Sequence, residues 1–482
     1  MNGSAMNGVA WLMTGLLAIS PAAARAETLQ QALALAYRDN PTLRGQQATL
    51  RATDENSVQA RTGWRPVVTA TSDAGYQKGP FASYDYGLGT IETNGAEALL
   101  TVKQPLYTGG RVINAVRAAD ARVQAGQQGL RLVEAQTFQS VILAYMDVLR
   151  DQDILSVRRA DLQTLTRQVT ETTSRFNLGA QVTRTDVAQA EAQQQQAVAS
   201  QADAEAQLEA SRAHYRAATG ILPGNLVAPG ALPGLPGNLD EANVFAAAAN
   251  PSLAQSLQTA RASQADIAAA RAAGAPMIGL QGSFGYVGPA APFHARNYDQ
   301  EATGLVTLTV PLTTGGLVQS QVRQARDRNE ADLQGVEAAA RQATQAVSIA
   351  WSQMQAGVKA TRANEGQVRA AATALRGYQA EYGYGLRTTL DVLIADENLR
   401  AAQVSLAQSR HDTIVAEADL LAATGRLEAR LLLEGEPRYD PQAEFRRVKH
   451  AGAVPWEGAV AALDRIGEHN GSRAGGNLPN NN

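Results

Sequence analysis

The chain has 482 residues, enough to bury a large core, yet aromatic residues make up only 5% of it. A composition so poor in aromatics differs from that of an ordinary globular enzyme and suits long helices that pack through small side chains. The formal net charge of −3 excludes the basic field that nucleic-acid binding requires.

Residues 1–26 are predicted to be a secretory signal peptide. An apolar run from Val9 to Ile19 is too short to span a bilayer, and Ala24-Arg25-Ala26 has the small-x-small pattern of a cleavage site. The alternative is a buried N-terminal helix. Without any cysteine, the exported chain uses neither disulfides nor a cysteine-attached lipid. No later run of about 18 apolar residues follows, so a membrane-spanning part would have to be a closed β-barrel.

The first elements after the leader are a broken helix and a hairpin. We predict a helix over residues 28–62 that is interrupted at Asn40-Pro41, because Asn-Pro indicates a stop followed by a new helix N-terminus. We predict a strand at Val67–Tyr76, followed by a long polar loop at Gln77–Glu97 that leads into a second strand.

That second strand belongs to a motif that the chain contains twice. Ala98–Arg111 recurs as Gly304–Leu317, and each copy reads as a strand that stops at a proline, a Gly-Gly turn and a very long helix. The two prolines, Pro105 and Pro311, lie 206 residues apart (311 minus 105). The spacing indicates an internal duplication.

The first long helix is predicted from Arg111 to about Arg175, roughly 95 Å at 1.5 Å per residue. It turns near Gly179 and returns from about Thr185 to Gly220. Because the return is only about half as long, we expect it and the opening helix to stack end to end beside the long helix. A Pro/Gly-rich linker follows, and the plan then repeats. The second copy has a joint at Asn250-Pro251, a strand at Pro276–Tyr286, a loop at Val287–Glu301, a helix from Leu317 to about Tyr382 and a return from about Thr389 to Gly425.

Apolar residues recur every seven positions in both long helices, which predicts a left-handed supercoil. The first series is Val141, Val148, Leu155, Leu162 and Val169, and adding 206 to each number yields Val347, Met354, Thr361, Val368 and Leu375. The second return helix keeps a similar line that Thr413 interrupts. We therefore divide the chain into a signal peptide (1–26), a first repeat (27–220), a linker (221–240), a second repeat (241–430) and a partly disordered C-terminal tail (431–482).

The predicted strands alternate between apolar and polar residues, which suits a barrel wall between lipid and water. Four strands cannot close around a channel, and open edges are forbidden in lipid, so several chains must share one sheet. Three chains would supply twelve strands, continued by the helices as a tube about 100 Å long.

These motifs together resemble the TolC family of outer-membrane channel-tunnels over roughly residues 27–430. The resemblance is carried by the signal peptide, the duplication and four local motifs: Gln104-Pro-Leu-Tyr-Thr-Gly-Gly110, Arg175-Phe-Asn-Leu-Gly179, Thr185-Asp-Val187 and Tyr384-Gly-Leu-Arg-Thr-Thr-Leu-Asp-Val392. The opening Thr28-Leu-Gln-Gln-Ala-Leu-Ala is more similar to the type I secretion and multidrug branch than to lipidated efflux channels.

The resemblance implies a mainly α chain with a small β part. Long coiled-coil hairpins would form a periplasmic α-barrel, and four strands per chain would contribute to a trimeric twelve-stranded β-barrel in the outer membrane of a Gram-negative bacterium. It implies a homotrimeric, passive exit duct for efflux or type I secretion. Its partners would be a periplasmic adaptor (membrane fusion protein), an inner-membrane ABC or RND pump and outer-membrane lipid, with no nucleic acid.

The resemblance also implies a gate where the long helices turn. Tyr382 would hydrogen-bond Asp186, Arg387 would bond the neighbourhood of Thr185, and Asp391 would form an acidic ring that favours cations. From residue types alone, helix capping is the favoured explanation for Asp186 and Asp391, and only the resemblance favours the gate.

No motif predicts an enzyme, a cofactor or a metal site. The five histidines, 214, 294, 411, 450 and 469, are scattered without metal-ligand spacing. The competing interpretations are a periplasmic adaptor and an exported coiled-coil structural protein. An adaptor normally has one helical hairpin with lipoyl-like and barrel domains, and a coiled-coil protein would not need repeated strand pairs.

Overall fold

The computed structural model describes residues 26–83, 87–179, 182–289, 298–433, 435 and 437–466. The predicted signal peptide, apart from Ala26, and the end of the chain from residue 467 lie outside these residues. The helices are α1 Leu29–Asp39, α2 Pro41–Arg61, α3 Arg111–Asn177, α4 Arg184–Thr219, α5 Leu239–Ala249, α6 Pro251–Ala272, α7 Leu317–Gly383, α8 Thr389–Ala423, α9 Ala429–Leu432, α10 Pro441–Val448 and α11 Glu457–Arg465, with a 3-10 turn η1 at Thr62–Trp64. The strands are β1 Ala26–Glu27, β2 Val67–Ser83, β3 Gly87–Tyr107, β4 Asn225–Leu226, β5 Met277–Pro289 and β6 Asp299–Thr309.

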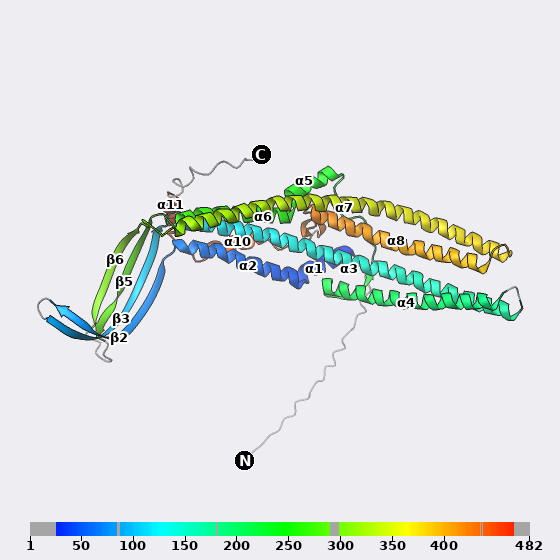
Figure 1. The fold of residues 1–482 in the computed structure, drawn as a ribbon, viewed down its shortest axis with the longest axis horizontal. Coiled ribbons are helices and arrows are strands. Elements are labelled where there is room, and N and C mark those ends of the chain that lie inside the picture. Colours follow the sequence, from blue (N-terminus) through cyan, green and yellow to red (C-terminus); the bar gives the residue numbers. More distant parts are fainter. Residues whose placement is uncertain are drawn as a thin grey trace, which may run out of the picture.

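A four-stranded sheet occupies one end of an elongated molecule, and the long helices extend away from it (Figure 1). The sheet is antiparallel in the order β2-β3-β5-β6. Each strand continues into a helix, and the helices keep the same order, since α2 packs on α3, α3 on α6 and α6 on α7. The sheet and the helical layer are therefore one continuous wall. None of the helices in the described part of the chain combines the length and apolar character needed to cross a bilayer.

The register of the sheet sorts its side chains by polarity. Cross-strand partners lie on the same face, so the pairs Val68–Val102, Leu100–Phe284 and Leu280–Val306 share one face. The large apolar side chains of these pairs are all exposed. The opposite face carries a polar row: Thr69, Thr71, Thr101, Lys103, Gln281, Ser283, Thr303 and Thr307. The predicted alternation is confirmed.

The bounds predicted for the long helices are confirmed to within two residues. Both begin after a glycine pair with left-handed backbone, Gly109-Gly110 and Gly315-Gly316, whose φ values lie between 59° and 84°. Such φ values are strained for other residues, so glycine is what allows the chain to turn from strand into helix here.

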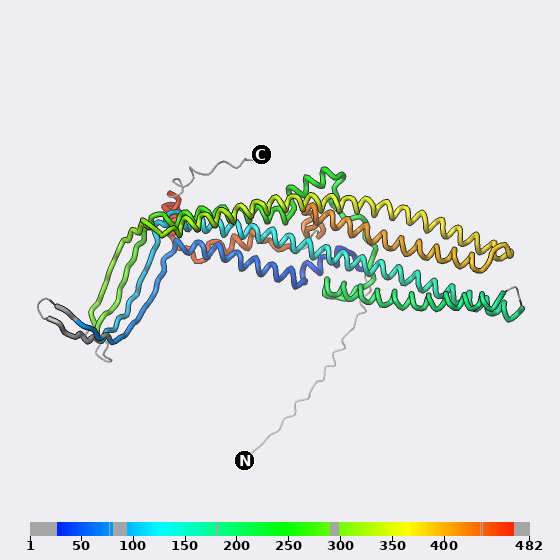
Figure 2. The backbone as a smooth tube through the Cα atoms, viewed as in Figure 1, coloured from blue at the N-terminus to red at the C-terminus, as the bar shows by residue number. Residues whose placement is uncertain are grey.

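The Asn-Pro joints organise both repeats in the same way. Asn40 caps α2, and its Nδ2 donates to the carbonyl of Ala218 at the end of α4 (3.3 Å). Asn250 caps α6, and its Nδ2 donates to the carbonyl of Ala423 at the end of α8 (2.9 Å). The short helices therefore meet end to end beside the long one, as the helix lengths predicted, and Figure 2 follows this path along the backbone.

The seven-residue line lies inside the helical layer. Val141 and Val347, related by the duplication, are both fully buried. Thr361 is the one polar member of the second line. Its hydroxyl donates to the carbonyl of Ser409 and lies 3.0 Å from the hydroxyl of Thr413. The two threonines that interrupt the apolar lines of α7 and α8 thus bond to each other.

The prediction of a loop at Gln77–Glu97 is wrong, because β2 and β3 stay paired through this segment, up to Ser83 opposite Gly87. The β5 partner of β3 reaches only Gly95, so beyond it the hairpin is a two-stranded ribbon. The sequence of this segment lacks the alternation of apolar and polar residues that marks a strand packed on one face. The predicted loop Val287–Glu301 is also shorter than expected, since β5 stays paired with β3 up to Pro289 and β6 starts at Asp299. Residues 290–297 within it lie outside the described part.

Pro105 does not end its strand, whereas β6 does end just before Pro311. β2 begins at Val67 opposite Lys103, so Pro105 lies beyond the end of that neighbour. The register with β5 shifts between Pro105 and Tyr107. A proline at such an irregularity costs the sheet little.

The tail predicted to be partly disordered contains two helices, α10 and α11, within residues 437–466, and its part from residue 467 lies outside the described residues. There α10 packs on α2, and α11 covers the junction between β3 and α3. Asp464 of α11 is fully buried and accepts from the amides of Thr108 (2.8 Å) and Gly110 (3.1 Å) and from Trp64 Nε1 (3.2 Å). Because Gly110 has no side chain to cap α3, a carboxylate about 350 residues away supplies the cap.

Asp464→Ala should therefore loosen the start of α3. The substitution leaves several buried donors without an acceptor, which we expect to cost about 3 kcal/mol. Amide hydrogen exchange at Thr108 and Gly110 should accelerate roughly 100-fold. Asp240→Ala, which removes an exposed acid from the first turn of α5, is the control and should leave these amides unchanged. Equal protection in both variants would contradict the capping role.

Candidate functional site

The two turns of the helical hairpins lie at the end of the molecule farthest from the sheet (Figure 2). One joins α3 to α4, and the other joins α7 to α8. Their sequences, Arg175 to Gly179 and Tyr384 to Asp391, contain or flank all the residues predicted for the gate.

The two return helices begin with the same device. Asp186 Oδ2 accepts from the backbone amide of Thr183 (2.8 Å), and the Thr183 hydroxyl accepts from the amide of Asp186. Asp391 and Thr388 repeat these bonds, at 2.9 Å and 3.3 Å. Hydrogen bonds from the threonine amides hold the pKa of both exposed carboxyls below the usual range. Helix capping, the role that residue types alone favoured, is thus what Asp186 and Asp391 do within a single chain.

Arg387 and Tyr382 make their contacts within the second hairpin. Arg387 Nε donates to Glu381 Oε2 at 2.7 Å, and its guanidinium lies 4.6 Å from the centre of the Tyr378 ring. The bond with Glu381 raises the pKa of Arg387 further. The Tyr382 hydroxyl accepts from Thr389 Oγ1 at 3.4 Å. Within one chain, therefore, Tyr382 is not bonded to Asp186, nor Arg387 to exposed Thr185, and the gate pairs stay a prediction.

A contact between the two turns does exist, and sequence reasoning missed it. The guanidinium of Arg175, in the last turn of α3, lies 5.0 Å from the centre of the half-buried Tyr382 ring. Cation–π contacts of this length are attractive. A basic residue at the end of a helix is favourable to the helix dipole wherever it occurs, so its position alone did not distinguish Arg175.

The turns also expose large apolar side chains to solvent. Leu178 in the first turn is 85% exposed, and in the second turn Tyr384 is 85% and Leu386 74% exposed. Such a cluster at the tip of a polar structure is typical of an interaction surface.

Farther up the helices, the two hairpins meet along α3 and α8 through a polar seam. His411 of α8 is buried, with Nε2 3.0 Å from Asp147 Oδ1 on α3 and Nδ1 2.8 Å from Asp412 Oδ1. Arg150 of α3 pairs with the same Asp147 at 2.8 Å. Burial opposes the charged imidazole, but the bonds to the two carboxylates outweigh it and raise the pKa of His411 above its usual value.

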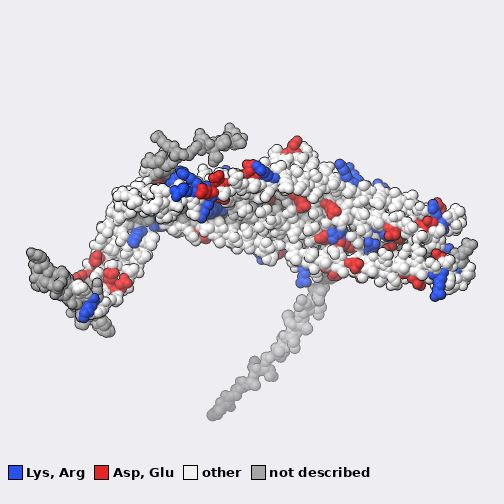
Figure 3. Space-filling view, viewed as in Figure 1, with Lys and Arg blue, Asp and Glu red and all other residues white. Residues whose placement is uncertain are grey.

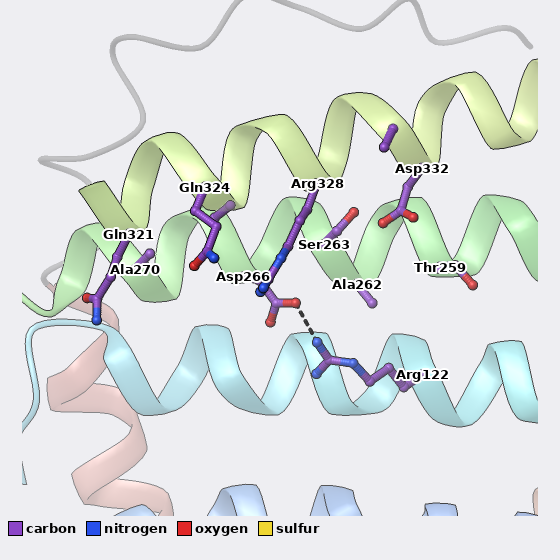
Figure 4. Close-up of a pocket in the computed structure, with 12 residues that line it drawn as sticks. Arg122, Thr259, Ala262, Ser263, Asp266, Ala270, Gln321, Gln324, Arg328 and Asp332 are labelled. Carbon is purple, nitrogen blue, oxygen red and sulfur yellow. Dashed lines mark hydrogen bonds and ion pairs between the residues drawn. The ribbon is translucent and has the colours of Figure 1, made fainter. Parts of the chain in front are cut away.

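One open groove, of about 660 Å³, lies between α3, α6 and α7 near the sheet. Figure 4 shows Arg122 of α3 bonded to Asp266 of α6, with Arg328 and Asp332 of α7 above them. Its lining is a mixture of small and charged side chains. No three His, Cys, Asp or Glu side chains gather as a metal site in the part of the chain that the structure describes. On the face shown in Figure 3, charged side chains are spread over the helices, while the sheet carries few between its two ends.

Comparison with known proteins agrees with this architecture. The family model described as outer membrane efflux protein matches residues 28–221 and 245–426. The chain is 34% identical over 427 residues to the outer membrane efflux protein BepC of Brucella suis biovar 1, covering 89% of this chain and 91% of that protein. It is 28% identical to the outer membrane protein TolC of Escherichia coli strain K12, covering 85% and 84% of the two chains.

Solved structures share the fold at lower identity. The CmeC outer membrane channel of Campylobacter jejuni superposes with a TM-score of 0.75 at 13% identity, covering 87% of this chain and 89% of that one. A membrane protein from Pseudomonas aeruginosa reaches a TM-score of 0.73 at 22% identity, covering 84% and 92%.

The polar seam leads to a prediction of pH dependence. Because the pKa of His411 is raised in the folded chain, its contribution to stability is full below the ordinary value of about 6.5 and is lost as the pH rises through the raised value. His411→Gln should therefore lower the unfolding temperature at about pH 6 and have less effect at about pH 9. The groups that act on His411 or its partner Asp147 are Arg150, Asp412 and His214 of α4.

The control for this measurement is His450→Gln, the same change at an exposed histidine that does not act on His411 or Asp147. It should shift the unfolding temperature little at either pH. A destabilisation by His411→Gln that is the same at both pH values would show that the imidazole contributes packing and not charge.

Proposed function

The chain belongs to the outer membrane efflux protein family, and from this premise we propose that it is a passive channel whose gate lies at the hairpin turns. It serves as an outer-membrane exit duct with a helical tunnel in the periplasm, for efflux or type I secretion. The observation that supports the passive role most strongly is the continuous wall: a sheet with one apolar and one polar face runs directly into an ordered layer of long helices. A wall of this kind encloses a path and needs no chemistry of its own.

We infer a homotrimer from the two edges of this wall. β2 and β6 each lack a neighbour on one side within the chain, and α2 and α7 lie at the matching edges of the helical layer. A lipid-facing sheet must satisfy all its backbone groups, so β6 of one copy would pair with β2 of the next. Three copies supply three times four, or twelve, strands and leave a lumen, whereas eight strands are just filled by side chains.

The gate is proposed at the hairpin turns because they form the end of the tunnel opposite the sheet. In this proposal Tyr382, Arg387, Thr185 and Asp186 hold the ends of neighbouring hairpins together, and three copies of Asp391 face the bore. One oxygen of Asp391 is engaged by Thr388, which leaves the other for passing cations. The contact of Arg175 with the Tyr382 ring adds a link between the two hairpins of one chain.

We propose that an adaptor docks on the exposed apolar turns. Leu178, Tyr384 and Leu386 project from the end that would face the inner membrane. Docking would bring an ABC or RND pump into line with the tunnel and move the hairpins apart. The pump would supply both the energy and the choice of cargo, because the tunnel has no chemistry for either.

The experiment that tests the duct and the gate together is single-channel conductance of the purified trimer in planar bilayers, with and without divalent cation. We expect a small, cation-selective conductance. Arg175→Ser, and separately Tyr382→Phe with Arg387→Ser, should raise it several-fold because each removes links between the hairpin ends. Asp391→Asn should lower the preference for cations and the block by divalent cation.

Tyr384→Phe is a matched control, since this tyrosine lies in the same turn but is 85% exposed. If the gate variants conduct like this control, the gate lies elsewhere while the duct stands. A folded, membrane-extracted trimer that does not conduct at all would overturn the duct itself.

A further inference from the structure

We propose that α11 is an interfacial anchor that rests on the inner leaflet of the outer membrane through Trp456 and Leu463. The proposal rests on the placement of the sheet in that membrane and goes beyond the duct function, because it assigns a lipid-binding role to a C-terminal segment outside the family match.

The two faces of α11 differ in what they contact. Val460, Ala461 and Asp464 point into the junction between β3 and α3 and are buried. Trp456, Leu463 and Ile466, spaced seven and three residues apart, lie on another face and are 49%, 47% and 69% exposed. Figure 1 places α11 at the bend where the strands end and the helices begin. Both faces thus carry apolar side chains, and among the described residues only the face of Val460 and Ala461 is covered by other parts of the chain.

Trp456 is tied to the apolar face of the sheet. Its Nε1 donates to Oε1 of Gln104 at 3.1 Å. Gln104 follows Leu100 and Val102 at two-residue spacing along β3, so its side chain lies on the same face as these exposed apolar side chains. It is at the end of β3 that leads into the helices. An indole with its ring beside an apolar surface and its N–H on a polar partner is what a membrane–water interface favours.

The position of Trp456 matches the thickness of a membrane. On the same face, Tyr76 is 62% exposed and pairs with Asn94, which precedes Gln104 by ten residues (104 minus 94). Ten residues at about 3.3 Å each make roughly 33 Å, or roughly 25 Å along the normal for strands tilted by about 40°. The apolar band of outer-membrane barrels is about 25 Å tall. Tyr76 and Trp456 therefore mark its two boundaries.

Lipid is a better partner than a neighbouring copy of the chain for the exposed stripe formed by Trp456, Leu463 and Ile466. α11 packs mainly on β3 and α3, which lie one strand and one helix in from the edge formed by β2 and α2, where β6 and α7 of the next copy would join, and it touches η1 beside that edge. The exposed Arg465, on the same helix, suits the phosphate headgroups at this depth. The stripe is also continuous with the apolar face of the sheet, which already meets lipid.

The chain contains no cysteine, so a single introduced cysteine can carry an environment-sensitive fluorophore. We would label Leu463→Cys in the full-length trimer, reconstituted in vesicles of phosphatidylethanolamine and phosphatidylglycerol. Nitroxide lipids labelled near the headgroup should quench this fluorophore roughly twofold more than lipids labelled deep in the acyl chain. Aqueous iodide should quench it weakly.

Two further cysteine variants make the result decisive. Leu100→Cys, on the apolar face of the sheet and 46% exposed, should be quenched by the deep nitroxide, and its failure would remove the membrane placement itself. Val244→Cys on α5, 65% exposed and far from the sheet, should be quenched by iodide alone. If the Leu463 label behaves like the Val244 label, or is shielded from every quencher by a neighbouring copy, the anchor is overturned while the Leu100 result still stands.

Discussion

Backbone hydrogen bonding in lipid is the constraint on which this structure depends. A sheet that turns an apolar face outward cannot leave the amides and carbonyls of its edge strands unpaired, since no water is present to satisfy them. In the described residues this sheet nevertheless has four strands, with β2 and β6 at open edges. Closure by further copies is the solution open to it, and because the helices follow the strand order, closing the sheet also closes the helical layer. The membrane part and the tunnel thus share a single geometric requirement.

Much of the fold could be predicted because its boundaries are set by local chemistry. Glycine pairs with left-handed backbone start both long helices, and Asn-Pro joints divide the short ones. The misses have equally physical causes. The end of the first hairpin, where β2 and β3 pair beyond the last β5 partner in the described residues, lacks a period of two in its sequence. The docking of α11 depends on Asp464, whose partners are some 350 residues away and leave no mark on the nearby sequence.

The candidate site was predicted less completely than the fold. The sequence identified the turns and the carboxylates, and residue types alone allowed capping for Asp186 and Asp391, which is the role the threonine bonds display. The roles proposed for them in a ring or between copies would depend on neighbours from other chains, which no pattern within one chain can specify. Arg175 escaped notice because an arginine in the last turn of a helix is common for reasons of the helix dipole alone.

The hydroxyl pair between Thr361 and Thr413 has a mechanical consequence for the second hairpin. Elsewhere along the α7–α8 contact the layers are mostly apolar, so sliding one arm by a heptad would set each hydroxyl against hydrocarbon and break the bond between the two, although Thr413 would keep its bond to the Ser409 carbonyl in its own helix. Losing a hydrogen bond between two half-buried hydroxyls costs about 1 kcal/mol. The pair therefore opposes sliding of α7 along α8. α7 and α8 keep their register, so any displacement of the turn that joins them moves both helices together.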